Sequence, residues 1–251
     1  MEEVQGKRVP RAMVGCAGWN IPRSYAARFR GEDSQLERYA RVFSAVEINS
    51  SFYRPHKPET YERWAASVPE GFRFAVKVPR VITHSRKLKD AGVEMRAFLS
   101  ECRYLGAKLG PLLVQLPPSL AFNSEVAEPF FSLLRGEFDG QVACEPRHAS
   151  WFAPTAGDLL LSYRVARVAA DPAILPAAAE PGGWGGLVYY RLHGSPRIYY
   201  SAYLPPYLEG LAGSLAQAAE LGADTWCIFD NTAEGAATGN ALTIMEHSQR
   251  V

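Results

Sequence analysis

Short apolar runs alternate with longer amphipathic stretches along the chain, and this alternation most strongly constrains the fold. The runs are about five residues long, and the stretches between them carry apolar residues at helical spacing. Such alternation is typical of successive βα units around a parallel sheet. We predict eight strands, near residues 13–16, 45–49, 73–77, 112–116, 142–145, 165–171, 187–193 and 225–230.

Amphipathic helices are predicted between these strands. Leu36, Tyr39 and Ala40 recur at helical spacing, and Asn123 and Asn231 are plausible cap residues ahead of two helices. The helices are expected near 34–42, 59–67, 93–105, 125–134, 154–163, 206–221 and 234–247. Eight strands with intervening helices over 251 residues predict an α/β fold, a single parallel (β/α)8 barrel of the TIM type.

The alternative of an open nucleotide-binding sheet is weakened by missing motifs. No Gly-x-Gly-x-x-Gly follows the first strand, and no Walker loop occurs. Gly-rich residues 180–186 form either a flap or a linker, and we favour the linker. Without a repeat or an interdomain linker, residues 1–251 are expected to form one domain, with a barrel from about 12 to 248 and a tail at 1–10.

Composition limits the function classes. Hydrophobic residues make up 47% of the chain, enough for a full core, and the net charge of +1 provides no global attraction for nucleic acid. No apolar run approaches a membrane span and the first residues lack a signal-peptide core, so we expect a soluble, cytoplasmic protein without a membrane partner. The four cysteines form no Cys-x-x-Cys pair and are predicted to be buried free thiols.

Side-chain parity predicts which residues line the barrel interior, because alternate residues of a strand face opposite sides. Glu145 shares a face with Ala143, and Lys77 shares a face with Ala75. The predicted polar layer at the C-terminal mouth contains Glu47, Asn49, Lys77, Gln115, Glu145, Asp171, Arg191, His193 and Asn231. Barrels of this type keep their active sites at that end.

Seven short motifs lie one after another along the chain. They are Val14-Gly-Cys-Ala-Gly-Trp19, Val46-Glu-Ile-Asn-Ser-Ser-Phe-Tyr53, Phe72-Arg-Phe-Ala-Val-Lys-Val-Pro79 with Ile82-Thr-His84, Val114-Gln-Leu-Pro-Pro118, Glu145-Pro-Arg-His148, Tyr190-Arg-Leu-His-Gly194 and Phe229-Asp-Asn-Thr232. With these motifs in this order, the chain resembles the YecE-like family, a domain of unknown function, from about Val14 to Ala241, which implies a TIM-barrel-like fold and no particular reaction. It departs from the family pattern in two places: Asn20-Ile-Pro22 follows Trp19 where the family usually has a Ser-Tyr pair, and Asp230 stands where the family commonly has Asn.

Two interpretations of the polar layer need no organic substrate. In the first, three carboxylates balance three cations in an ion network that plugs the barrel. The carboxylates are those of Glu47, Glu145 and Asp171, and the cations are Lys77, Arg147 and Arg191. No cofactor is predicted, but a single divalent metal ion could be held by Glu145, Asp171 and His193. Five histidines without His-x-His spacing are too few for a trinuclear site.

A basic segment after the third strand favours an anionic ligand. Arg80, Arg86, Lys87 and Lys89 follow Lys77 closely. The leading hypothesis is therefore a hydrolase for a phosphate-bearing, nucleotide or nucleic-acid-like substrate, with Glu145, His193 and Glu47 as acid/base residues. The predicted binding residues are Lys77, Arg191, Gln115, Asn49, Tyr53, Arg147, His148, Trp19, Asp171 and Asn231.

Other functions use the same pocket. A glycosidase or sugar-converting barrel would use Glu47 and Glu145 as its carboxylate pair, with aromatic side chains stacked on the sugar. The candidate stacking residues are Trp19, Tyr53, Trp151, Tyr199 and Tyr203. Lys77 could form a Schiff base, although an ion pair with Glu47 or Glu145 is favoured. The third alternative is a non-catalytic binding protein.

Overall fold

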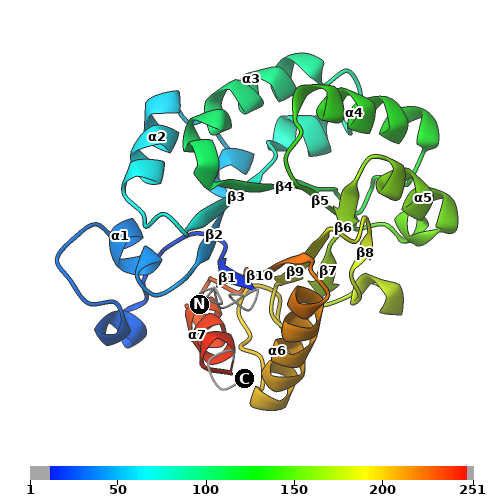
Figure 1. Ribbon diagram of the computed structural model, residues 1–251. Coiled ribbons are helices and arrows are strands. Elements are labelled where there is room, and N and C mark those ends of the chain that lie inside the picture. Colours follow the sequence, from blue (N-terminus) through cyan, green and yellow to red (C-terminus); the bar gives the residue numbers. More distant parts are fainter. Residues whose placement is uncertain (1–11, 248–251) are drawn as a thin grey trace, which may run out of the picture.

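The computed structural model describes residues 12–247, with strands at the centre and helices outside them (Figure 1). The main strands begin and end within a few residues of the predicted positions. The strands are β1 (Met13–Cys16), β2 (Ala45–Ile48), β3 (Arg73–Lys77), β4 (Leu109–Gln115), β5 (Val142–Glu145), β6 (Val165–Arg167), β7 (Ala169–Asp171), β8 (Gly182–Gly183), β9 (Leu187–Leu192) and β10 (Asp224–Phe229).

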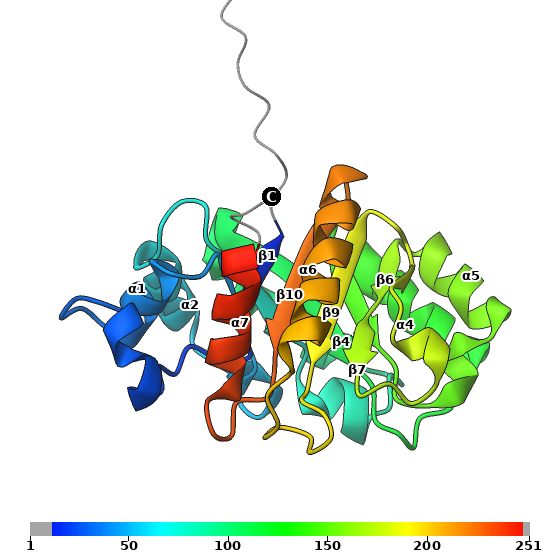
Figure 2. The ribbon, with the colours of Figure 1, turned by 90° about the horizontal axis from the view of Figure 1, so that it is seen from below.

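Helices of the described part of the chain lie close to the seven predicted stretches. Figure 2 shows α6 and α7 side by side, with α6 over β10 and α7 against β1 and β10. The helices are α1 (Gln35–Ala40), α2 (Pro58–Ala66), α3 (Gly92–Cys102), α4 (Ser124–Glu137), α5 (Pro154–Ser162), α6 (Pro205–Glu220) and α7 (Ala236–His247). Asn123 caps α4 as predicted, because its side-chain oxygen accepts a hydrogen bond from the Glu125 amide at 2.8 Å.

The strands form two sheets, with orders β1-β10-β9-β7 and β2-β3-β4-β5-β6-β8. Neighbouring strands are parallel except β6 and β8, which are antiparallel. The fold is therefore α/β with mainly parallel sheets, and the prediction of a single parallel eight-stranded barrel is met only in part. The predicted strand at 165–171 is divided at Val168, and the Gly-rich stretch predicted to be a linker contributes β8 instead.

The two sheets approach each other in two places, between β6 and β7 and between β1 and β2. The Val168 amide donates to the Cys144 carbonyl at 2.9 Å, and the next residues, in β7, pair with β9 of the other sheet. At the opposite edge, Ala17 and Glu47 form a parallel bridge between the end of β1 and β2. The Gly18 amide donates to the Glu47 carbonyl there at 2.9 Å.

The predicted alternation of side chains is confirmed on β2, β3, β4, β5 and β9. Ala45, Ala75, Leu113 and Ala143 belong to one buried cluster, which is separate from the larger core between strands and helices. Tyr189 belongs to the same inner cluster, and its ring stacks on that of Trp226 with centroids 6.0 Å apart. Small side chains on some strands thus leave space for large aromatic rings on others.

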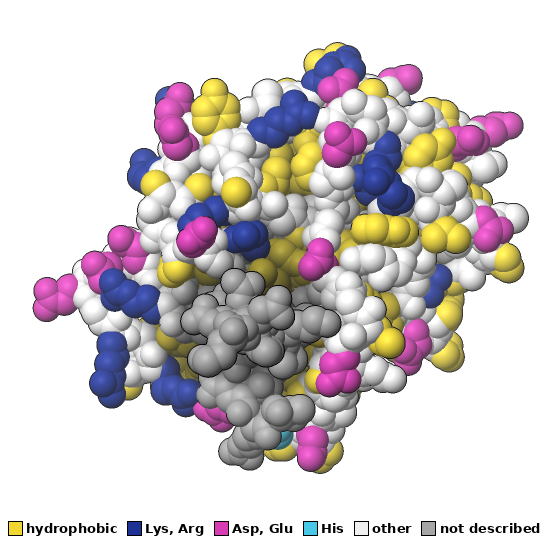
Figure 3. Space-filling view, viewed as in Figure 1, with side chains coloured by type: hydrophobic (Ala, Val, Ile, Leu, Met, Phe, Trp, Pro, Cys, Tyr) yellow, Lys and Arg dark blue, Asp and Glu magenta, His cyan; other side chains and the backbone are white. Residues whose placement is uncertain are grey.

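Surface and sulfur chemistry also agree with the sequence. Positive and negative side chains are interspersed on the face shown in Figure 3, as expected for a net charge of +1. The four cysteines are buried and unpaired, and burial raises the pKa of the Cys16 thiol to about 12.

Between residues 12 and 247, no helix combines the length and the hydropathy that a membrane span requires.

Candidate functional site

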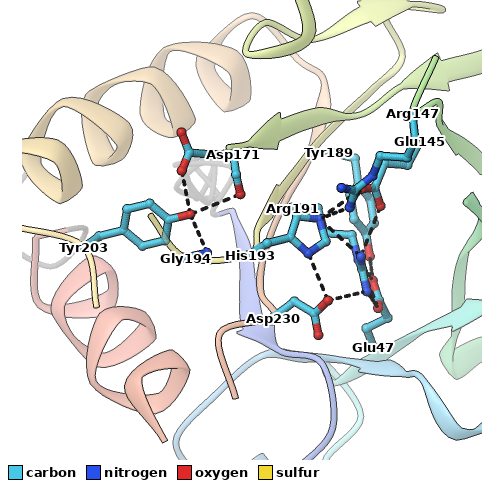
Figure 4. A network of polar contacts seen from close by, with 10 residues as sticks. All are labelled: Glu47, Glu145, Arg147, Asp171, Tyr189, Arg191, His193, Gly194, Tyr203 and Asp230. Atoms are coloured by element: carbon cyan, nitrogen blue, oxygen red, sulfur yellow. Dashed lines mark hydrogen bonds and ion pairs between the residues drawn. The ribbon is translucent and has the colours of Figure 1, made fainter. Parts of the chain in front are cut away.

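A buried guanidinium connects carboxylates from three strands (Figure 4). Arg191, on β9, donates from Nε and Nη2 to the carboxylate of Glu47 on β2, with a shortest distance of 2.7 Å. Its Nη1 lies 3.1 Å from Glu145 Oε2 on β5, and its Nη2 lies 3.0 Å from Oδ2 of Asp230, which directly follows β10. One side chain therefore joins the C-terminal ends of strands from both sheets.

The imidazole of His193 lies between two carboxylates. Its Nδ1 is 3.0 Å from Asp230 Oδ2, and its Nε2 is 2.9 Å from Glu145 Oε1. Nη2 of Arg147 lies 2.6 Å from the same Nε2 and forms an ion pair with Glu145. Nε2 can thus donate a hydrogen bond to Glu145 or accept one from Arg147, depending on the tautomer of the ring.

The hydroxyl of Tyr189 also fixes Glu47. It donates to Glu47 Oε2 at 2.9 Å. Burial, followed by the charge of Glu47, raises the pKa of Tyr189 well above its ordinary value. Tyr189 therefore stays protonated and acts as a hydrogen-bond donor.

Charge pairing outweighs burial throughout this network. Burial alone would raise the pKa of Glu145, but Arg191, Arg147 and His193 hold it well below its usual value. The pKa of Asp230 is lowered in the same way, mainly by Arg191, while the three carboxylates raise the pKa of Arg191 despite its burial. Glu145, Asp230 and Arg191 are therefore ionised at neutral pH.

Lys77 differs from the other cations at the strand ends. Its side chain is buried on β3, and its Nζ lies 4.1 Å from the centroid of the Phe52 ring. No carboxylate of residues 12–247 lies within 4.0 Å of this ammonium, so the predicted ion pair with Glu47 or Glu145 is wrong. Burial, followed by repulsion from Arg191, lowers the pKa of Lys77 to about 8.

Three further predicted residues leave polar atoms near these strand ends. Gln115 is the register partner of Glu145, so both side chains lie on the same face of the sheet. Asn49 Oδ1 and Arg147 Nε are buried, and neither has a hydrogen-bond partner among the described residues. Buried polar atoms without partners are uncommon and suggest room for a ligand or water.

The structure corrects the placement of Asp171 and Asn231. Asp171 Oδ1 accepts a hydrogen bond from the Tyr203 hydroxyl at 2.8 Å, away from the Arg191 network (Figure 4). Asn231 Nδ2 donates to the carbonyl of Ser201 at 2.8 Å and to Oδ1 of Asn240 at 2.9 Å. Neither side chain binds a side chain of the network, although the backbone carbonyl of Asp171 accepts a hydrogen bond from the His193 amide at 2.7 Å.

Strand phase explains both corrections. Ala166, Val168 and Ala170 belong to the inner cluster, so Asp171 is out of phase with the interior. On β10 the inner residues are Trp226 and Ile228, and two-residue steps from them lead to Asp230 and bypass Asn231. Asp230 is the main residue of the network that was not predicted from the sequence, although this spacing could have revealed it.

The candidate metal ligands are not brought together. Glu145 and His193 are adjacent, but Asp171 is bound to Tyr203. In the described part of the chain, no group of three or more His, Cys, Asp or Glu side chains has a geometry that could hold a metal ion.

Most predicted aromatic contacts lie outside the network. Trp19 packs edge-on against Trp64, Tyr53 is 74% exposed, and Nε1 of buried Trp151 donates to the Leu120 carbonyl at 3.0 Å. Tyr199 packs edge-on against His193, with ring centroids 6.0 Å apart. The remaining predicted residue, His148, does not reach the network either, because its Nδ1 interacts with Ser150.

The basic segment at residues 80–89 divides among three surroundings. Arg80 lines a pocket of about 420 Å³ together with Phe52 and Tyr53. Arg86 pairs with Glu94 at 2.6 Å, and Lys87 and Lys89 line a second pocket of about 380 Å³. The cations of this segment therefore do not gather around Lys77, although the predicted phosphate site required them to do so.

Proteins related to this chain carry no assigned activity in their names. Residues 13–250 match the model of the family "Protein of unknown function DUF72". UPF0759 protein YecE of Escherichia coli K12 is 35% identical over 141 residues, covering 56% of this chain and 50% of YecE. YunF of Bacillus subtilis 168 is 30% identical over 156 residues, or 60% of this chain and 55% of YunF. The chain thus aligns with about half the length of these curated relatives.

Solved structures support the fold. A DUF72 family protein of Enterococcus faecalis V583 is similar with a TM-score of 0.79 and 21% identity, over 95% of both chains. A DUF72 family protein of Thermotoga maritima MSB8 gives a TM-score of 0.78 and 22% identity, over 95% of this chain and 99% of that one. Since the family model covers nearly the whole described chain, this protein belongs to the DUF72 family.

Proposed function

We propose that the two sheets form one TIM-type barrel, whose C-terminal mouth binds a phosphate-bearing ligand and hydrolyses a phosphoester bond. Two features support the barrel. A single residue, Val168, separates β6 from β7, and the Ala17–Glu47 bridge connects the other edges of the two sheets. A substrate-binding mouth at the C-terminal ends of the strands is the usual arrangement in such barrels.

The observation that carries the proposal is the unpaired ammonium of Lys77. With a pKa of about 8, this buried group is mostly protonated at pH 7. Burial and Arg191 outweigh the more distant carboxylates of Glu47, Glu145 and Asp230, and a ligand anion in direct contact with the ammonium would reduce the remaining cost of burying it. The unpartnered Arg147 Nε and the Gln115 amide offer further donors near the same strand ends.

His193 is the residue best suited to move a proton. Asp230 and Glu145 hold its two ring nitrogens in place. Because its pKa is low, Glu145 is a weak base, and its role here is to orient the imidazole. During hydrolysis, water attacks phosphorus, the ester oxygen leaves, and His193 gives that oxygen the proton that it regains from the attacking water.

The arrangement of Glu47 and Glu145 does not favour a glycosidase. Both carboxylates bind the same guanidinium of Arg191, and both side chains are fully buried. Retaining and inverting glycosidases need a sugar, or a sugar and a water molecule, between the two carboxyl groups. Here the guanidinium takes that place.

Calorimetry with pyrophosphate and AMP tests the anion site. Wild type and Lys57→Met should bind alike, because Lys57 is an exposed residue whose side chain makes no cap hydrogen bond. Lys77→Met should bind about tenfold or more weakly, and raising the salt concentration should weaken wild-type binding. Equal binding by the two variants, or no binding by wild type, would contradict the proposal.

Hydrolysis of bis(p-nitrophenyl) phosphate separates an enzyme from a binding protein. Wild type should turn this substrate over, and His193→Gln should not. Pyrophosphate binding should change little in the variant, since Lys77 remains. Pyrophosphate binding without any turnover would instead favour the non-catalytic interpretation.

A further inference from the structure

A second pocket lies between the basic segment and α4, outside the Arg191 network. Its volume is about 380 Å³, and its lining includes Lys87, Lys89, Leu120, Phe122, Val126 and Trp151. Volumes of this size suit a small molecule and are too small for a folded partner. We call it the lysine pocket.

The walls of the lysine pocket are largely aromatic and aliphatic. Phe122 packs edge-on against Trp151, with ring centroids 5.0 Å apart. The Phe122 amide donates to Ser150 Oγ at 2.7 Å, and the indole of Trp151 donates to the Leu120 carbonyl. These contacts fix two rings against each other, and a flat apolar group can pack against such a wall.

Two cations at this pocket have no counter-ion. Lys87 and Lys89 are exposed, and none of the carboxylates between residues 12 and 247 forms an ion pair with either ammonium. The backbone that carries them is unusual, because Lys87 and Leu88 have φ angles of 50° and 71°. Residues other than glycine rarely adopt such angles, and they often do so at functional sites.

Leu88 explains how this backbone is held. Its side chain is buried, and its amide donates to the Ile82 carbonyl at 3.0 Å. Anchoring Leu88 in the core fixes the positions of Lys87 and Lys89 on either side of it. Both lysines therefore extend from fixed backbone positions that line the pocket.

We propose that the lysine pocket binds an aromatic anion, a small molecule that has a flat ring and a phosphate or carboxylate group. The ring packs against Phe122 and the aliphatic lining, while the anionic group binds Lys87 and Lys89. This site is independent of the function proposed for the mouth, because neither lysine contacts Lys77 or Arg191.

Phenyl phosphate is the probe for this site, measured by calorimetry on the full chain. We expect it to bind wild type at least tenfold more tightly than inorganic phosphate or phenol, because only phenyl phosphate uses both parts of the pocket. The double variant Lys87→Met/Lys89→Met should lose about tenfold in affinity, whereas Lys57→Met should match wild type. An unchanged affinity in the double variant would overturn the proposal.

A second variant tests the apolar wall without altering charge. Val126→Phe adds volume from α4 at the pocket and should weaken phenyl phosphate binding while the lysines remain. Lys77→Met separates this site from the mouth. Phenyl phosphate binding that survives Lys77→Met supports the lysine pocket, and binding that is lost with Lys77→Met assigns the ligand to the mouth and refutes it.

Discussion

The Arg191 network and the lysine pocket are both rich in charge, but they satisfy that charge in opposite ways. In the network, Arg191 binds three carboxylates and His193 binds two of them, with all of these side chains buried. At the lysine pocket, two exposed ammonium groups have no ion pair within the described chain. Charges that are paired with each other hold the strands together, while unpaired charges remain available for a ligand.

Lys77 is buried like the residues of the Arg191 network, but like Lys87 and Lys89 it forms no ion pair within the described chain. It lies on β3 near the network, but it forms no ion pair within 4.0 Å in the described chain, and its Nζ lies over the face of Phe52. The carboxylates of Glu47, Glu145 and Asp230 act on its charge only from farther away. The comparison thus predicts that substitutions in the network cost stability, whereas substitutions of unpaired cations cost binding.

Arg191→Met should have the largest effect on stability. It leaves the carboxylates of Glu47, Glu145 and Asp230 buried without their shared cation. We expect a loss of about 3–5 kcal/mol in the free energy of unfolding, or a drop in Tm on the order of 10 °C. Thermal melts measure this, and a Tm within about 2 °C of wild type would show that the network does not hold the sheets together.

Glu145→Gln should cost about 2 kcal/mol at pH 7, because the amide keeps some hydrogen bonds but not the charge. The pKa of Glu145 is lowered on folding, so its stabilising effect is present above the unfolded pKa of about 4.3 and is lost as pH falls through the folded value. Urea melts between pH 3 and pH 7 should therefore show a steeper loss for wild type than for the variant. Parallel curves would contradict the assigned pairing.

Lys77→Met should raise stability at pH 7 by about 1–2 kcal/mol, since it removes a buried unpaired cation, while it weakens anion binding. The pKa of Lys77 is lowered from 10.5 to about 8, so folding releases its proton between these values. Wild type should therefore gain stability as pH rises from about 8 toward 10.5, and the advantage of the variant should shrink. If the variant is less stable at pH 7, Phe52 compensates the charge and no ligand anion is needed.

Lys87→Met/Lys89→Met should change stability least, by less than about 0.5 kcal/mol, because both side chains are exposed and unpaired. Chemical denaturation measures this, with Lys57→Met as the matched control. A loss of more than about 1 kcal/mol would show that these lysines are structural and would remove the contrast with the network.

Tertiary structure decided which acidic residue completes the site. The predicted strand at 165–171 breaks at Val168, and the inner residues Ala166, Val168 and Ala170 place Asp171 in the other phase. Asp171 then binds Tyr203, while Asp230 binds His193 and Arg191. A shift of one residue along a strand turns a side chain to the opposite face of the sheet. No residue pattern in the sequence predicts the break at Val168.

The sequence by itself determined the order of strands and helices, the family, and the inward direction of Glu47, Lys77, Glu145 and Arg191. It could do so because side chains alternate with a period of two along a strand. Only the tertiary structure decided their partners, since Arg191 and Glu47 lie 144 residues apart in the chain. The side-chain directions of the basic segment at residues 80–89 could not be predicted either, because a loop has no regular period.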